Sequence, residues 1–386
     1  MRKFMTFFLV LALVMLHLFL IVGCKNTPPE LNSKSPKFEE NETVAERNNG
    51  CPDSKDDSPK QSRQNTEDEK EIEEDKEAEN SPALTEQQLQ EIQPNELGEI
   101  MILMYHRIGS QELDWERHYN NFRKDLERLY SKGYRPINLQ DLIDNQIDLD
   151  PGYTPFILTF DDSTPGQFRY IEENGELVID PQCAVGIMKD FNKENPDFAL
   201  KGTFYTNYSA PPFRQAELVK EKLEFLVDKG MEIGNHTYNH INLRNASIDT
   251  MQKELGHHAQ KTREYIPGYQ IRSLALPYGG IPPADKEPYV YSGQYEDVTY
   301  KNEAVLLVGS NPTPAPNHKN FNLKRLPRIR GSQDELDRWF NYFNKYPERR
   351  YVSDGDPDNI TFPEELKDSL EPESLGNKEI RTYDLP

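Results

Sequence analysis

The chain has 386 residues, which is room for one large domain or two small ones with accessory segments. Its formal net charge is −21 at pH 7, which argues against a nucleic-acid binder, since phosphate contacts need clustered Lys and Arg. The charge is uneven along the chain, because residues 25–98 carry 20 acidic side chains against 9 basic ones.

The first 24 residues have the pattern of an export signal. Arg2 and Lys3 precede an apolar run from Phe4 to Val22, and the segment ends in Gly23 and Cys24. It resembles a bacterial lipoprotein signal peptide, which implies that Cys24 is acylated and anchors the chain in the cell membrane. A plain transmembrane anchor is the alternative. Both interpretations place the rest of the chain on the extracytoplasmic face.

Residues 25–98 are rich in Glu, Asp, Lys, Asn, Ser and Pro, and such a segment cannot bury enough apolar area to offset its ordering entropy. We expect a disordered acidic linker with a short helix at Thr85–Ile92. Of the two other cysteines, Cys51 lies in this linker and Cys183 in the folded part, so no structural disulfide is expected.

Strands and helices alternate from Glu99 onward, which predicts an α/β fold with a parallel sheet or barrel of about seven core strands. Apolar runs predict strands within residues 99–108, 155–162, 201–207, 231–236, 271–280, 303–310 and 322–329, and a short strand followed by a helix within 136–144. Amphipathic periodicity predicts helices within residues 118–134, 215–230, 247–265 and 332–346. The acidic residues 347–386 are expected to form a C-terminal extension on the surface.

A hairpin is predicted between Phe168 and Asp180. Asn174-Gly175 separates two short apolar runs there, and Asn-Gly in that setting is a strong turn signal. Since the segment follows the paired carboxylates Asp161 and Asp162, the hairpin is expected at the mouth of whatever they line.

Chemistry-bearing residues lie where the predicted strands end. Asp161 and Asp162 close one strand, and His236 and His240 follow another. In parallel α/β folds, ligands bind beyond the carboxyl ends of the strands. The H-x3-H spacing alone also fits two surface histidines. Together with a carboxylate, it makes a three-ligand set that leaves positions open, as in catalytic zinc and similar divalent sites.

Three motifs carry a family resemblance. "LTFDD" at 158–162, "HTYNH" at 236–240 and "LPYG" at 276–279 follow one another as in the polysaccharide deacetylase family, the NodB-homology domain, and "LMYHRI" at 103–108 is similar to how many members begin. The resemblance covers residues 99–346. It implies an irregular (β/α)7-type barrel, which agrees with the strand count.

The resemblance also implies roles for the motif residues. Asp161 is similar to the family's catalytic base, and Asp162, His236 and His240 to its metal ligands, with Zn2+ expected and Co2+ or Ni2+ as alternatives. The backbone N–H of Tyr278 would help to hold the oxyanion, with Pro277 and Gly279 as substrate contacts. The implied activity is removal of N-acetyl groups from a cell-envelope polysaccharide by a monomeric, lipid-anchored hydrolase.

Three departures from the family pattern stand out. Ser163 replaces the usual Gly, and Ala275 occupies the place of an arginine that holds the base, with Arg272 as a nearby candidate substitute. The late histidine, the family's general acid, has no match, because Pro327 and Arg328 stand where it would be sought.

His106 at the end of the first strand is the candidate stand-in acid. The alternative is a histidine hydrogen-bonded to the barrel rim, and His318 in a polar loop is a weaker candidate. The departures also favour two other functions: a glycan-binding lipoprotein with impaired catalysis, or an esterase that removes O-acetyl groups with the same metal site.

Several aromatic and histidine residues have simpler interpretations. The side chains of Trp115, Tyr119 and Phe122 are expected in helix packing rather than in a sugar platform, and His257 and His258 in solvent. A substrate groove is a possible role for the tyrosines of the loop after "LPYGG": Tyr289, Tyr291, Tyr295 and Tyr300.

Overall fold

The computed structural model describes residues 84–385, so the predicted signal with Cys24, most of the linker, and Cys51 lie outside the described residues. The helices are α2 Glu86–Ile92, α3 Tyr119–Ser131, α4 Leu139–Ile143, α5 Ala184–Glu194, α6 Val219–Asp228, α7 Ile248–Tyr265, α8 Pro288–Tyr291 and α9 Gln333–Lys345. The strands of the main sheet are β1 Glu99–Tyr105, β4 Tyr134–Pro136, β5 Thr154–Asp161, β8 Thr203–Thr206, β9 Glu232–Asn235, β10 Ser273–Ala275, β13 Ala304–Leu306, β14 Thr313–Pro314 and β15 Ile329–Arg330.

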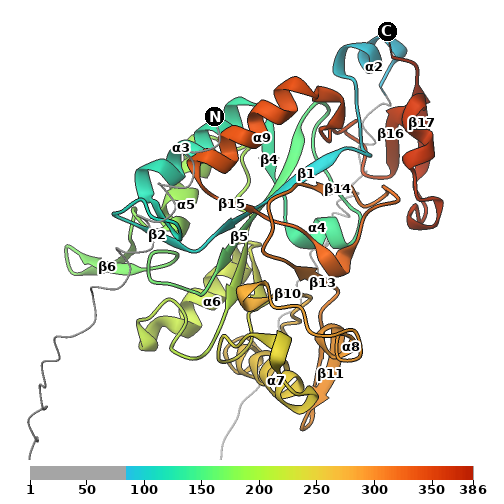
Figure 1. Cartoon of the computed structure of the whole chain (residues 1–386). Coiled ribbons are helices and arrows are strands. Elements are labelled where there is room, and N and C mark those ends of the chain that lie inside the picture. The colour runs from blue at the N-terminus through green and yellow to red at the C-terminus, as the bar shows by residue number, and fades with distance from the viewer. Residues whose placement is uncertain (1–83, 386) are drawn as a thin grey trace, which may run out of the picture. The chain divides into compact units, whose positions relative to one another are not determined.

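Seven parallel strands form the core of the sheet in the order β13-β10-β9-β8-β5-β1-β15. β4 pairs with the start of β5, and β14 runs antiparallel to β1. The sheet curls so far that Leu326, just before β15, pairs with Leu306 of β13. The segment 326–330 therefore joins both edges of the curled sheet, and the predicted irregular α/β barrel is confirmed (Figure 1).

Side chains alternate between the two faces of each strand, as the pleat requires. Four helices, α3, α5, α6 and α9, cover the outer face, where their apolar side chains pack against one large core that includes Phe122 and Trp339. A smaller cluster fills the concave interior, and it includes Ile157, Tyr205 and Ala275. Because every residue of β5 is buried, this strand can carry a charged residue only at a site that compensates the charge.

Four further two-stranded pairs lie beside the barrel. They are β2 Arg107–Gly109 with β3 Glu116–His118, β6 Tyr170–Glu173 with β7 Glu176–Ile179, β11 Ser292–Tyr295 with β12 Val298–Lys301, and β16 Asn359–Pro363 with β17 Glu379–Tyr383. The β6–β7 pair is the hairpin that Asn174-Gly175 predicts.

The two ends of the described chain pack together, and α2 lies beside β16 and β17 in Figure 1. Asn95 pairs with Val352, and the hydroxyl of Tyr383 donates to the Pro94 carbonyl. The predicted linker boundary at residue 98 was therefore wrong for residues 84–98, because Leu89 and Glu96 are buried against the C-terminal segment. Among residues 84–385, no helix is both long and apolar enough to cross a membrane.

Candidate active site

Three turns at the carboxyl ends of the strands bring the predicted site residues together. The turns follow β5, β9 and β10, and each contains residues with positive φ, which is costly for side chains other than glycine. Asp162 and Ser163 have φ of 75° and 45°, Thr237 and His240 have 57° and 55°, and Tyr278 has 59°. Such strain persists where the surroundings enforce it, and it gathers at functional sites.

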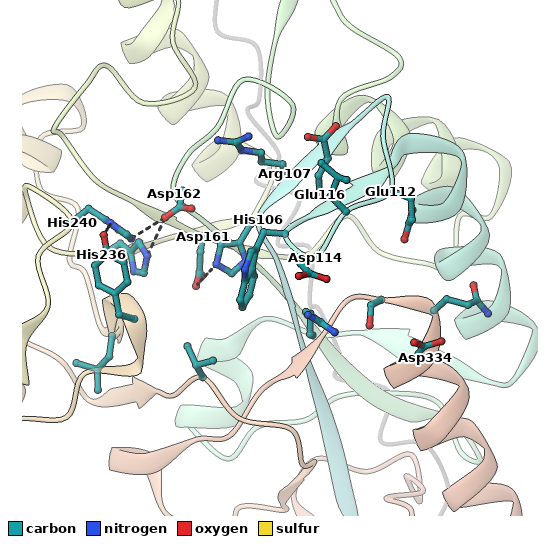
Figure 2. Close-up of a pocket in the computed structure, with 18 residues that line it drawn as sticks. His106, Arg107, Glu112, Asp114, Glu116, Asp161, Asp162, His236, His240 and Asp334 are labelled. Carbon is teal, nitrogen blue, oxygen red and sulfur yellow. Dashed lines mark hydrogen bonds and ion pairs between the residues drawn. The ribbon is translucent and has the colours of Figure 1, made fainter. Parts of the chain in front are cut away.

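Asp162, His236 and His240 lie together as a candidate metal site (Figure 2). The Oδ1 atom of Asp162 is 3.0 Å from Nε2 of His240 and 3.4 Å from Nε2 of His236. Three ligand atoms all lie within 4.8 Å of one another. Two imidazole nitrogens and one carboxylate oxygen form a donor set that suits Zn2+ and similar divalent ions.

Groups outside the triad orient its two imidazoles. Nδ1 of His236 is 2.8 Å from the carbonyl oxygen of Ala275, and Nδ1 of His240 is 3.1 Å from the hydroxyl of Tyr278. A histidine whose Nδ1–H donates to a carbonyl has its Nε2 free to bind a metal ion. Metal-binding imidazoles usually have such a hydrogen-bond partner on the ring nitrogen that does not bind the metal. Burial raises the pKa of Asp162, but the neighbouring imidazoles of His236 and His240 lower it by more, so this carboxyl is held ionised.

Asp161 is buried inside the barrel and is bound by Arg328. The Nη1 and Nη2 atoms of Arg328 each lie 2.7 Å from one carboxylate oxygen, in a bidentate pair. Burial raises the pKa of Asp161, and the charge of Arg328 outweighs this effect and lowers it. The suggested substitute Arg272 was wrong, because its guanidinium pairs with Asp144 and Glu303 instead.

His106 follows β1 and faces the same carboxylates. Its Nε2 is 3.9 Å from Oδ2 of Asp161, and within residues 84–385 its ring makes no hydrogen bond to the barrel rim. Burial lowers the pKa of His106, and the charges of Asp161 and Asp162 offset only part of this effect. The ring of Trp115 lies 4.6 Å from the His106 ring, so the imidazole is half-enclosed beside the site.

These residues line a cavity of about 1240 Å³ (Figure 2). Four large apolar side chains of its lining are among the most exposed in residues 84–385: Leu113, Trp115, Tyr278 and Val308. Trp115, 49% exposed, comes from the loop between β2 and β3 rather than from helix packing. An exposed apolar patch beside converging polar groups is the usual mark of a binding site.

Several residues expected at the site lie elsewhere. Pro277 and Gly279 shape the turn after β10 but do not line the cavity, and neither does the β6–β7 hairpin. The four tyrosines after "LPYGG" do not line it either. His258 is fully buried rather than solvated, with its Nε2 atom 2.7 Å from the Thr206 carbonyl oxygen, and burial lowers its pKa to about 3.

Comparison with known proteins shows which family part of the chain is similar to. A model of the family "Polysaccharide deacetylase" matches residues 152–287. The match covers about a third of the chain, and it makes this segment similar to that family. No curated protein sequence matches the chain.

Solved structures of deacetylases align with the chain at low identity. The Streptococcus pyogenes deacetylase PplD in complex with acetate is 19% identical, with 62% of this chain and 97% of that chain covered and a TM-score of 0.47. IcaB from Ammonifex degensii is 15% identical, with 64% and 97% covered and a TM-score of 0.45. A de-N-acetylase from Aggregatibacter actinomycetemcomitans is 14% identical, with 60% and 94% covered and a TM-score of 0.42.

The matched segment 152–287 contains both aspartates, the two histidines of the candidate metal site and Tyr278, but His106 and Arg328 lie outside it. In the sequence, Arg328 stands out only as one of the positions where the family's late histidine is missing. A signal was present, however, because Leu326, Arg328 and Arg330 alternate with Pro327 and Ile329 as they do in a strand. That alternation places Arg328 and Arg330 on the same side as Leu326, and only the pairing of Leu326 with Leu306 shows that this side faces the barrel interior.

Proposed function

We propose that the protein is a metal-dependent hydrolase that removes N-acetyl groups from a cell-envelope polysaccharide. The observation that carries the proposal is the convergence of Asp162, His236 and His240 beside the buried base candidate Asp161, in an open cavity. At about 1240 Å³, the cavity exceeds the 300–1,000 Å³ usual for small-ligand pockets, which fits a polymeric substrate.

Asp162, His236 and His240 would hold the divalent ion. The ion would supply Lewis acidity toward the acetyl carbonyl and would lower the pKa of water in the site. Zn2+ fits the mixed nitrogen and oxygen donors, and Co2+ or Ni2+ fits the same set.

The side chains of the chain itself carry the proton transfers. Asp161, kept ionised by Arg328, takes the proton of the attacking water while the water oxygen bonds to the carbonyl carbon. The Tyr278 N–H donates to the oxygen that becomes negative. His106 gives a proton to the amide nitrogen as the C–N bond breaks, so acetate and a free amine leave.

The main reason for the alternative function, a glycan-binding protein without turnover, is weakened. It rested on the missing arginine beside the base and on the absent late histidine. Arg328, just before β15, supplies the first, and His106 lies 3.9 Å from the base as a candidate for the second.

Acetate release tests the proposal. The full chain, loaded with Zn2+, Co2+ or Ni2+, is incubated with N-acetylglucosamine oligomers and with purified peptidoglycan, and acetate is measured. Release that disappears in Asp161→Asn is expected. A metal-loaded chain that binds these glycans without releasing acetate would instead support the binding protein, and faster turnover of an O-acetyl ester than of the acetamide would support the esterase.

We also propose that the protein is a monomeric lipoprotein at the extracytoplasmic face of the membrane. Support comes from the sequence alone, through the basic start, the apolar run and Cys24. A Cys24→Ala variant is expected to lose lipid labelling and to move from the detergent phase to the aqueous phase on partition. Unchanged partition would favour the plain transmembrane anchor.

A further inference from the structure

A lysine of α6 is buried without a carboxylate partner. Lys222 is fully buried, and no acidic side chain of residues 84–385 forms an ion pair with it. Its Nζ donates instead to the carbonyl oxygens of Phe213 and Arg214, at 3.3 Å and 3.4 Å. Burial lowers the pKa of this amine to about 8, so it is still mostly charged at pH 7. A buried ammonium without a counter-ion is costly, which points to a role beyond packing.

The two carbonyls that Lys222 binds belong to a strained stretch of backbone. Phe213, Arg214 and Gln215 have φ of 58°, 56° and 52°, which makes residues 213–215 a left-handed stretch. Side-chain-bearing residues visit this region singly, because Cβ approaches the following carbonyl oxygen. The Phe213 ring is buried in the outer core, and the Gln215 amide bonds both the N–H and the carbonyl of Tyr170. Lys222 supplies the remaining restraint, on the carbonyls.

The left-handed stretch supports the turn that carries Asp162. The Phe213 N–H donates to the carbonyl oxygen of Ser163 at 2.7 Å, and Ser163 directly follows Asp162. The carbonyl of Asp162 accepts a longer bond, 3.4 Å from Nδ2 of Asn207. The bond from Phe213 is therefore the tighter of the two contacts on this turn.

Ser163 explains why the turn needs support from outside. Its φ of 45° lies in the left-handed region, which glycine adopts without penalty, and the family pattern has glycine at this position. Asp162 before it has φ of 75°, so the turn contains two strained residues in succession. Since such strain persists only where the surroundings enforce it, a serine here requires a contact that a glycine would not.

We propose that Lys222 is a positioning residue for the candidate metal site: by holding the left-handed stretch, it keeps the Phe213 N–H on Ser163 and maintains the strained turn that aims Asp162 at the two imidazoles. This role rests on the proposed function. Lys222 does not line the cavity, so it acts through the backbone of residues 213–214. Without the ammonium the left-handed stretch relaxes, and the Asp162 turn relaxes with it.

The test is the Co2+ affinity of the full chain, measured by titration of the Co2+ absorption spectrum. Lys222→Met keeps the side-chain length and is expected to weaken binding about tenfold, as is usual when a residue that orients metal ligands is lost. Lys220→Met is the matched control, because this lysine lies on the same helix with an exposed side chain and should leave the affinity unchanged. Wild-type affinity in Lys222→Met would refute the role.

A glycine rescue separates positioning from a general loss of stability. In Lys222→Met with Ser163→Gly, the turn no longer needs the contact from Phe213, so affinity should recover about threefold or more. If Lys222 only stabilised the fold, a glycine in a different segment would not restore metal affinity. A double variant that binds Co2+ as weakly as Lys222→Met would therefore refute the role.

A second variant covers the case in which Lys222→Met does not fold. Arg214 is exposed, and a glycine in its place adopts the left-handed conformation without a cation. Lys222→Met with Arg214→Gly should therefore fold and bind Co2+ as the wild type does. If it folds but binds about tenfold more weakly, or does not fold either, Lys222 does something other than hold the left-handed stretch.

The outcomes distinguish this role from the proposed function. If the wild-type chain binds no Co2+ and releases no acetate, the proposed function itself is wrong. If the wild-type chain binds Co2+ and releases acetate while Lys222→Met keeps its affinity, only the role of Lys222 is wrong.

Discussion

Binding of a divalent ion at the triad should stabilise the fold measurably. The site exists only in the folded chain, because Asp162 comes from the turn after β5 while His236 and His240 come from the turn after β9. At a free Zn2+ concentration of 100 Kd, binding contributes about 2.7 kcal/mol to the free energy of unfolding. With an unfolding entropy of about 2.1 cal/mol/K per residue, this raises Tm by roughly 4 °C when residues 84–385 are counted.

The assay is thermal unfolding of the full chain with and without Zn2+, followed by a chelator to test reversal. His240→Ala removes a half-exposed ligand with little effect on packing, so it should melt close to the metal-free wild type and show no Zn2+ shift. His257→Gln on α7 is the matched control, because this imidazole lies against Tyr238 and Tyr295 outside the triad, and it should keep the shift. An equal Zn2+ shift in wild type and His240→Ala would refute the site, since the ion would then bind elsewhere.

Three further predictions concern the cavity, the sheet and the terminal contacts. Trp115→Ala should raise KM for glycan oligomers about tenfold, or about 1.4 kcal/mol, whereas Leu177→Ala, also exposed but outside the cavity, should leave KM unchanged; an unchanged KM in Trp115→Ala would exclude a stacking role. Gly234→Ala should destabilise the fold by about 1–3 kcal/mol in denaturant unfolding, because its methyl group would overlap the Tyr205 ring; an unaltered midpoint would contradict this packing. Burial and the charge of Asp354 raise the pKa of Glu96 to about 8, above its ordinary 4.5, so between these pH values the folded state holds a proton that the unfolded state has lost. The free energy of unfolding should therefore fall as pH rises from 5 to 8, and Glu96→Gln should flatten that slope.

Local pattern predicted most of the barrel correctly. The buried run of β5, the amphipathic helices α3, α6, α7 and α9 and the Asn-Gly hairpin all depend on periodicity and turn chemistry within a few residues. Residues 84–98 were assigned to the linker because they are polar, yet Glu96 is buried where the Tyr351 hydroxyl and the Thr361 N–H donate to it. Those partners are more than 250 residues away in sequence, so no local pattern could reveal them.

The same limit explains the residues missed at the site. His258 looks like a solvated helix residue from its neighbours, but its side of α7 packs where the Thr206 carbonyl accepts a hydrogen bond. Arg328 looks like one charge in a basic stretch, and only closure of the sheet through Leu326 shows that it points inward. Tertiary contacts between distant segments decide such cases, whereas the Asp-Asp and H-x3-H motifs act within one turn each.

The geometry of β5 explains how neighbouring aspartates come to differ. Ile157, Thr159 and Asp161 share the interior face because side chains alternate along a strand, so Asp161 meets the guanidinium that also binds Thr159. The next residue would point to the outer core if the strand continued, where a carboxylate has no partner. Asp162 instead leaves the strand with φ of 75°, which turns its side chain to the rim and the two imidazoles. The strained backbone of that turn lets the two adjacent aspartates contact different partners, and the strand therefore ends at Asp161.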